Sequence, residues 1–252
     1  MEKNNMKNTT VIIPVHKIDE NTEALLKRAV DSVDKEKFEV IFVGPKEVLD
    51  KISGLYEDAT LVENEETDVY VQINKAVMQC VTEFFTVLEL DDALLPNWAK
   101  MVDEVENDSV VLPINEYVEL VKDQFVFRAF GNEIGWDAAF FEEDEDGSIH
   151  VGHLTTHELK IFNDFNVTGA LIRTEDFLSL GSLKPEYKIL AWYEFLMRVA
   201  RAGKGIYVFP RVCYSHTVLR PDSYMEHIKD IITPEEVSEK LKEIVGEEER
   251  KD

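Results

Sequence analysis

The chain has 252 residues, of which 44% are hydrophobic, and it carries 51 acidic against 27 basic side chains, a formal net charge of -24. This length and composition predict a globular protein of one or two domains, and the negative charge argues against binding nucleic acid. The first residues, MEKNNMKNTT, lack the apolar core of a signal peptide, and no apolar run approaches the roughly 18 residues that cross a bilayer. We therefore expect a cytoplasmic protein without a membrane span.

Short runs of β-branched residues alternate with longer helical patterns over the first 90 residues. Strands are predicted at TVIIPV (10–15), FEVIFV (38–43), ATLV (59–62) and FFTVLEL (84–90). Helices are predicted between them at 22–33, 46–55 and 69–81. This alternation is typical of an α/β fold with a mostly parallel sheet flanked by helices. Because the run at 84–90 is almost entirely apolar, we expect a central strand that is buried on both faces.

The regular pattern ends after SVVLP (109–113) and returns near residue 166. Residues 116–165, with turn-rich and acidic segments such as FEEDEDGS, are predicted to be an irregular, variable insert. Beyond them we expect a strand in VTGALIR, a helix in TEDFLSLG, a long helix in ILAWYEFLMRVARAG and a strand in GIYVFP. The predicted organisation is an N-terminal tail (1–9), one domain (10–225) and a C-terminal helical tail (226–252).

The C-terminal tail contains TPEEVSEKLKEIVG, the pattern of an amphipathic helix. Thr233 is the expected N-cap residue and Glu236 completes a capping box, while apolar residues recur on one face. Such a helix either docks on its own domain or binds a partner.

Several common sites are excluded by the residues themselves. The turn after the first strand, PVHKIDEN, has no glycine, so it cannot wrap its backbone around a phosphate as a dinucleotide-binding turn or a P-loop does. The sequence also lacks a G-x-S-x-G elbow and an H-E-x-x-H zinc motif. The remaining candidate is the group of carboxylates that follows the run at 84–90.

Glu89, Asp91 and Asp92 come directly after the predicted central strand. The carboxyl ends of parallel strands face the ligand crevice of an α/β sheet, and hard divalent cations prefer oxygen ligands. The pattern is therefore compatible with a metal site. Spacing alone, however, favours solvated acids that end a strand and precede a helix beginning near Pro96.

Four segments carry a family resemblance when they are taken in order. They are the opening TVIIPVHK…LLKRAVDSV…FEVIFV, QINKAVMQCVTEFFTVLELDDALLPNWAKMV, VTGALIRTEDFLSLGSL, and AWYEFLMRVARAGKGIYVFPRVCYSHTVLRPDSY. Together they resemble the family-2 glycosyltransferases of the GT-A (Rossmann-like) fold, over about residues 10–115 and 166–225. In that family an Asp-x-Asp segment leads through L-x-P into a helix, as the acids at 89–92 do here.

The resemblance implies a Mn²⁺ or Mg²⁺ ion that holds the diphosphate of a nucleotide sugar during inverting transfer to an acceptor. Carried over to this chain, the metal-side residues are Glu89, Asp91 and His216. The residues expected to bind the donor are Asp91, Asp92, Asn74, His16 and Lys46.

The chain departs from the family at three positions, of which the first is Glu89 where the family has aspartate, a change that a hard cation tolerates. The chain also has VGPKEV where the second strand usually ends in Asp-Asp-Gly-Ser, and it has Ala191 and Trp192 where the last helix supplies acids. Glu194 is the nearest candidate for the catalytic base, although a surface pair with Arg198 is the alternative. Two functions therefore stay open. One is a metal-dependent glycosyltransferase, and the other is a non-catalytic binding or structural module with protein partners, for instance in a viral or phage particle.

Overall fold

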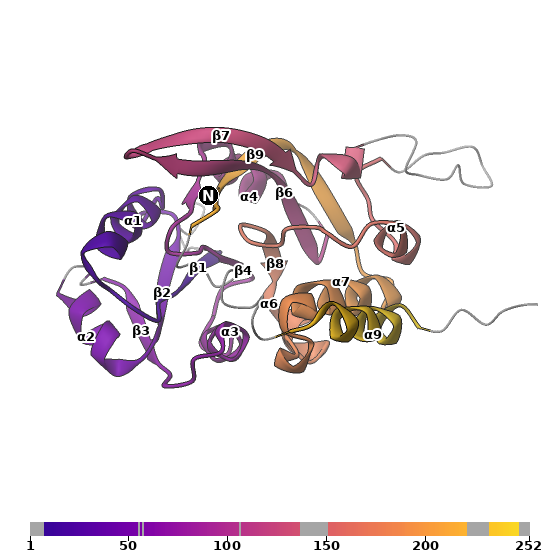
Figure 1. Cartoon of the computed structure of the whole chain (residues 1–252), viewed down its shortest axis with the longest axis horizontal. Helices are drawn as coiled ribbons and strands as arrows, with labels where there is room; N and C mark the ends of the chain where they lie inside the picture. Colours follow the sequence, from indigo (N-terminus) through magenta and orange to yellow (C-terminus); the bar gives the residue numbers. More distant parts are fainter. Residues whose placement is uncertain are drawn as a thin grey trace, which may run out of the picture.

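The computed structural model describes residues 8–54, 56, 58–105, 107–136, 151–220 and 232–246. It is an α/β structure in which helices cover both faces of one mixed sheet (Figure 1). The strands are β1 (Thr9–Pro14), β2 (Glu39–Gly44), β3 (Thr60–Glu63), β4 (Phe84–Val87), β5 (Ala93–Leu94), β6 (Val110–Val121), β7 (Gln124–Gly131), β8 (Leu171–Arg173) and β9 (Ile206–Val218). The α-helices are α1 (Glu20–Asp31), α2 (Lys46–Ser53), α3 (Val69–Val77), α4 (Pro96–Glu104), α5 (Thr156–Ile161), α6 (Thr174–Ser179), α7 (Ala191–Arg201) and α9 (Pro234–Val245). Two 3₁₀ helices are η1 (Glu133–Trp136) and η3 (Pro185–Leu190).

The sheet has the strand order β3-β2-β1-β4-β8-β6-β9-β5, with β7 paired to β6. The first four strands are mutually parallel, as the alternating pattern predicts, while β8 runs antiparallel to both β4 and β6. Strand β4 lies between β1 and β8, and all four of its residues are buried. The predicted central strand and the α/β fold class are therefore confirmed.

The sheet separates two hydrophobic cores because successive side chains of a strand point to opposite faces. In β1, Val11 and Ile13 pack in one core with apolar residues of α1, α2 and α4, whereas Ile12 packs in the other. That second core contains apolar residues of α3, α6 and α7. The packing fixes the register of the parallel strands, since a one-residue slip would exchange their two buried faces.

The prediction of an irregular insert at 116–165 is wrong for the first part of this range. Strand β6 continues to Val121, and residues 124–131 return alongside it as the antiparallel strand β7. Lys122 and Asp123 join the two strands with φ values of 49° and 63°, as a two-residue type I′ hairpin requires. Neither is the glycine or asparagine that usually marks such a turn, so the sequence gives little sign of it. The acidic segment 141–148 lies outside the described residues.

The C-terminal helix α9 docks on its own domain. Its N-terminus has the predicted capping box, in which the Thr233 side chain accepts from the Glu236 backbone and the Glu236 side chain accepts from the Thr233 backbone. Ile244 is buried, and the Glu243 carboxylate accepts a hydrogen bond from the Tyr187 hydroxyl at 2.7 Å. Within the described part of the chain, no helix combines the length and apolar character that crossing a membrane requires.

The hairpin turn yields a stability prediction. Replacing Lys122 with glycine should raise the free energy of unfolding by about 0.5 to 1 kcal/mol, because a glycine adopts a positive φ without the steric cost that lysine has. The matched control is Lys100→Gly, the same change at an exposed position inside α4, which should lower the free energy of unfolding by about 0.5 to 1 kcal/mol. Urea unfolding of both variants measures the two signs. Destabilisation by both would contradict the described turn.

Candidate functional site

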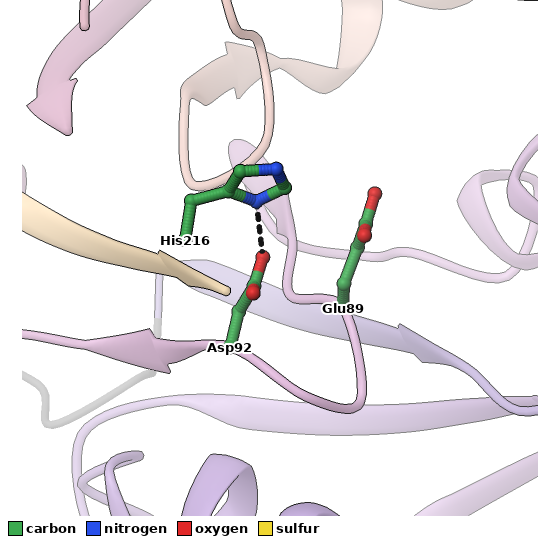
Figure 2. Close-up of side chains that lie close together, drawn as sticks. All are labelled: Glu89, Asp92 and His216. Atoms are coloured by element: carbon green, nitrogen blue, oxygen red, sulfur yellow. Dashed lines mark hydrogen bonds and ion pairs between the residues drawn. The ribbon is translucent and has the colours of Figure 1, made fainter. Parts of the chain in front are cut away.

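The acidic turn that follows β4 lies against the strand β9. Short strand β5 pairs antiparallel with β9, and its register places Ala93 opposite Ser215. This pairing brings the preceding residue, Asp92, beside His216, while Glu89 projects toward the same space from the start of the turn (Figure 2). Residues more than 120 positions apart are thus joined at the carboxyl end of the central strand, where an α/β sheet ordinarily binds its ligand.

Asp92 is completely buried, and its carboxylate accepts three hydrogen bonds. Oδ2 accepts from the Tyr214 hydroxyl at 2.7 Å and pairs with His216 Nδ1 at 2.8 Å. Oδ1 accepts from the backbone N–H of Thr217 at 2.7 Å. A buried carboxylate needs such partners to offset its lost hydration, so these contacts fix both the turn and the orientation of the imidazole.

Asp91 has different partners. Its carboxylate forms an ion pair with Arg220, at 2.9 Å between Oδ2 and Nε. Its carbonyl oxygen accepts from the Thr217 hydroxyl at 2.6 Å and from the Arg28 guanidinium at 2.9 Å. The backbone of the turn is therefore held by β9 and α1, while the side chain of Asp91 meets a cation on the segment that follows β9.

The close carboxylates perturb one another's ionisation. Burial, together with the charges of Asp92 and Asp91, raises the pKa of Glu89 to about 8, against the opposing effect of His216. Burial and Asp92 also raise the pKa of Asp91 to about 6, although Arg220 opposes this. Burial favours the neutral imidazole of His216, but the neighbouring acids, Asp92 foremost, raise its pKa to about 9. The site therefore concentrates negative charge that an additional cation would stabilise.

The donor atoms suit a hard divalent cation. One ligand atom each from Glu89, Asp92 and His216 lie within 4.8 Å of one another, and they offer two carboxylates and one imidazole nitrogen. Asp92 already accepts three hydrogen bonds, which is the arrangement of a carboxylate that orients a ligating histidine. Of the predicted metal residues, Glu89 and His216 belong to this group, whereas the carboxylate of Asp91 is paired with Arg220. The part of Asp91 in holding an ion stays a prediction.

Two other predicted residues are engaged with the segment 180–184. The side-chain amide of Asn74 donates to the carbonyl of Leu183 at 2.8 Å and accepts from its N–H at 3.0 Å. Glu194 accepts from Lys184 at 2.8 Å and from both Nε and the terminal nitrogen of Arg198. The pair between Glu194 and Arg198 is therefore present, but Glu194 is buried and not on the surface. Lys184 is a second cation beside the same carboxylate. The assignment of Glu194 as a catalytic base stays a prediction.

The last two predicted residues lie where neighbouring strands end. His16 is exposed two residues after β1, and Lys46 is the first residue of α2, directly after β2. Lys46 Nζ pairs with Asp50 at 3.3 Å on the surface. Both residues share the carboxyl edge of the parallel strands with the acidic turn.

Sequence reasoning missed four residues that build the site: Arg28, Tyr214, Thr217 and Arg220. Tyr214 and Thr217 were not assigned to a strand, because the sequence predicts a strand that ends at residue 210, whereas β9 continues to Val218. Arg28 occupies a polar position in the predicted helix 22–33, which gives it no special role. Arg220 stands in the sequence LRPDS, which is typical of a turn. The alternating pattern of VCYSHTV was the available signal for a longer strand.

Comparisons with known proteins agree with this architecture. The model of the family "Glycosyl transferase family 2" matches residues 10–155, more than half of the chain. No curated protein matches.

Two solved structures share the fold. TarS 1–349 of S. aureus in complex with UDP-GlcNAc has 18% sequence identity and a TM-score of 0.63, and the match covers 94% of this chain and 65% of that one. The mannosyltransferase PcManGT of Pyrobaculum calidifontis in complex with GDP-Man and Mn²⁺ has 14% identity and a TM-score of 0.61, and covers 88% of this chain and 60% of that one. This chain therefore spans less than two thirds of either.

The hydrogen bonds of Tyr214 yield a second prediction. In Tyr214→Phe the donor to Asp92 and the acceptor for the Glu89 N–H are both lost, so the free energy of unfolding should fall by about 1 to 3 kcal/mol. The matched control is Tyr56→Phe, where a partly exposed ring stacks on Phe42 and the change should stay within about 0.5 kcal/mol. Chemical denaturation measures both. Equal effects of the two changes would contradict the structural role given to Tyr214.

Proposed function

Because this chain belongs to glycosyl transferase family 2, we propose that it transfers a sugar from a nucleotide-sugar donor to an acceptor in a reaction assisted by Mn²⁺ or Mg²⁺. The observation that carries the proposal is the convergence of Glu89, Asp92 and His216 at the carboxyl end of the central strand. Family membership supports the donor class, and the oxygen-rich centre supports the cation.

We assign the cation to Glu89, Asp91 and His216, with Asp92 as the carboxylate that orients the imidazole. When bound, the ion would neutralise charge on the donor's diphosphate and so stabilise it as a leaving group. The protein's own part is to hold two acids and a histidine in fixed positions. A chain of net charge -24 repels an anionic donor unless cations are concentrated where the diphosphate sits.

Three basic groups are placed to help with the donor. Arg220 brings a guanidinium to Asp91, and its ion pair keeps that group at the centre. His16 and Lys46 stand after β1 and β2, on the edge where the nucleotide of the donor is expected. We propose that Lys46 contacts phosphate, in place of the acid that the family carries after its second strand.

The acceptor's proton requires a base, and we look for it on α7, where the family resemblance implies an acid. Glu194 is the candidate on α7, but its two carboxylate oxygens are occupied by Lys184 and Arg198. Those contacts describe a residue that also positions the segment 180–184. The proposed inverting reaction therefore depends on Glu194 acting as the base. If Glu194 has no role and no nucleotide-sugar donor binds, the non-catalytic alternative holds.

Metal binding is the first test. Calorimetric titration of the protein with Mn²⁺ in the presence of UDP or GDP should show metal-dependent nucleotide binding, which Asp91→Asn and Glu89→Gln each weaken by about tenfold or more, since each removes one charged ligand. Asp103→Asn, at an exposed position of α4, is the matched control and should bind as the unchanged protein does. If Asp92→Asn lost binding while Asp91→Asn bound fully, the result would assign the ion to Asp92 and contradict its assignment to Asp91.

Turnover is the second test. Incubation with UDP-linked and GDP-linked sugars should release nucleoside diphosphate in a reaction that EDTA stops and Mn²⁺ restores, because the leaving diphosphate needs the cation. If Glu194 takes the acceptor's proton, Glu194→Gln should reduce release by about 100-fold or more while leaving nucleotide binding intact. Unchanged turnover in that variant would remove Glu194 from the mechanism. Neither binding nor release with any donor would favour the non-catalytic module.

A further inference from the structure

A row of exposed apolar side chains covers one face of the hairpin formed by β6 and β7. The most exposed members are Phe127 and Phe130, at 50% and 47%, and their rings lie 4.8 Å apart. Leu120 and Phe125 extend the row toward the turn, with exposures of 40% and 39%. We name these four residues the hairpin face. Large apolar side chains gathered in this way on a soluble protein mark an interaction surface.

The hairpin face and His216 lie on opposite sides of the sheet. Phe125 is the member nearest the site, because the guanidinium of Arg28 lies 3.8 Å from its ring centroid. Tyr117 contacts the ring of His216, so these two residues share the face of the sheet that bears the acidic centre. Val118 is paired with Phe127, and Leu120 with Phe125, one and three residues along β6 from Tyr117. Because side chains alternate along a strand, the hairpin face lies on the opposite side of the sheet from His216. Donor and acceptor binding at the acidic centre therefore do not account for the exposure of Phe127 and Phe130.

Strand β7 also has a free edge in the described part of the chain, where it pairs with β6 alone. Its residues from Gln124 to Phe130 are all exposed, and none of them is acidic or proline. A register shift beside Tyr117 and Val118 leaves Arg128 as a bulge, so the regular part of this edge is Gln124 to Phe127. An edge of this kind, without proline or inward-pointing charges, presents its backbone N–H and C=O groups to a complementary strand. The geometry therefore calls for a partner that is itself a β-strand.

Charge narrows the choice of partner. The chain carries 51 acidic residues, but the stretch from Gln124 to Asn132 contains none, and its single cation, Arg128, is paired with Glu119. Two copies with a net charge of -24 repel one another over most of their surfaces. They meet least repulsion along this neutral, apolar strand.

We propose that two copies of this chain associate through β7, each strand pairing antiparallel with its own copy about a two-fold axis. An axis perpendicular to the sheet keeps the hairpin faces of both copies on the same side, so that Phe127 and its neighbours meet across the axis as a shared apolar cluster. The two sheets then form one continuous sheet. The contact is independent of sugar transfer. Because it involves one strand edge and a small apolar cluster, we expect a dissociation constant on the order of micromolar.

Sedimentation velocity of the full chain, from about 1 to 100 µM, tests the proposal. The unchanged protein should pass from one to two copies per particle over this range. Raising NaCl from about 0.05 to 0.5 M should strengthen the association, since salt screens the repulsion between two acidic chains. Phe127→Glu and Phe127→Lys should each weaken it by tenfold or more, because both place a charge at the apolar contact.

The controls separate this contact from other causes. Val81→Glu changes a 95% exposed apolar residue elsewhere and should leave the dimer intact. Thermal unfolding of the two Phe127 variants checks that they fold, and Lys in place of Phe127 distinguishes an apolar contact from an electrostatic one. A chain that stays monomeric at every concentration would overturn the proposal, as would a dimer that both Phe127 variants leave unchanged. A monomer that floats with neutral phosphatidylcholine vesicles would identify a membrane-binding face instead and equally overturn it.

Discussion

The carboxylate of Asp92 is the group around which the site is organised. It is fully buried, and it accepts hydrogen bonds from Tyr214, from His216 and from the backbone of Thr217, three residues of one strand. An unpaired charge at this depth would cost several kcal/mol, so the turn after β4 and the end of β9 must stay together for the fold to persist. The positions of Glu89 and Asp91 follow from that attachment, because both belong to the same short turn.

Much of this architecture can be read from the sequence. The alternation of β-branched and helical segments gives the parallel half of the sheet, the apolar run at 84–90 gives its central strand, and the capping box gives α9. These elements can be predicted because local periodicity and capping residues determine them. The family resemblance rests on the same segments, and the match over residues 10–155 confirms it.

The parts that could not be read depend on pairing between distant segments. Residues 211–218 of β9 are extended because they pair with β6 and β5, and this pairing is not specified by a local pattern. The hairpin turn at Lys122 uses a positive φ without the usual residues, and the contrast between Asp91 and Asp92 arises only from their neighbours in space. Two adjacent aspartates look alike in a sequence, yet one faces Arg220 and the other is enclosed by donors. The roles of site residues therefore lie at the tertiary level, where sequence reasoning is weakest.

The different surroundings of the acids have a consequence for how such a protein changes over evolutionary time. Asp92 contributes to folding through its three donors, so selection for a folded chain alone is enough to retain it. Glu89 stands in an electrostatically unfavourable place, where burial and neighbouring acids raise its pKa to about 8, and folding by itself gives no reason to keep it. A lineage that abandoned ligand binding would be expected to lose Glu89 early while preserving Asp92. Among related sequences, Glu89 is therefore expected to vary with ligand binding, whereas Asp92 is expected to be retained wherever the fold is.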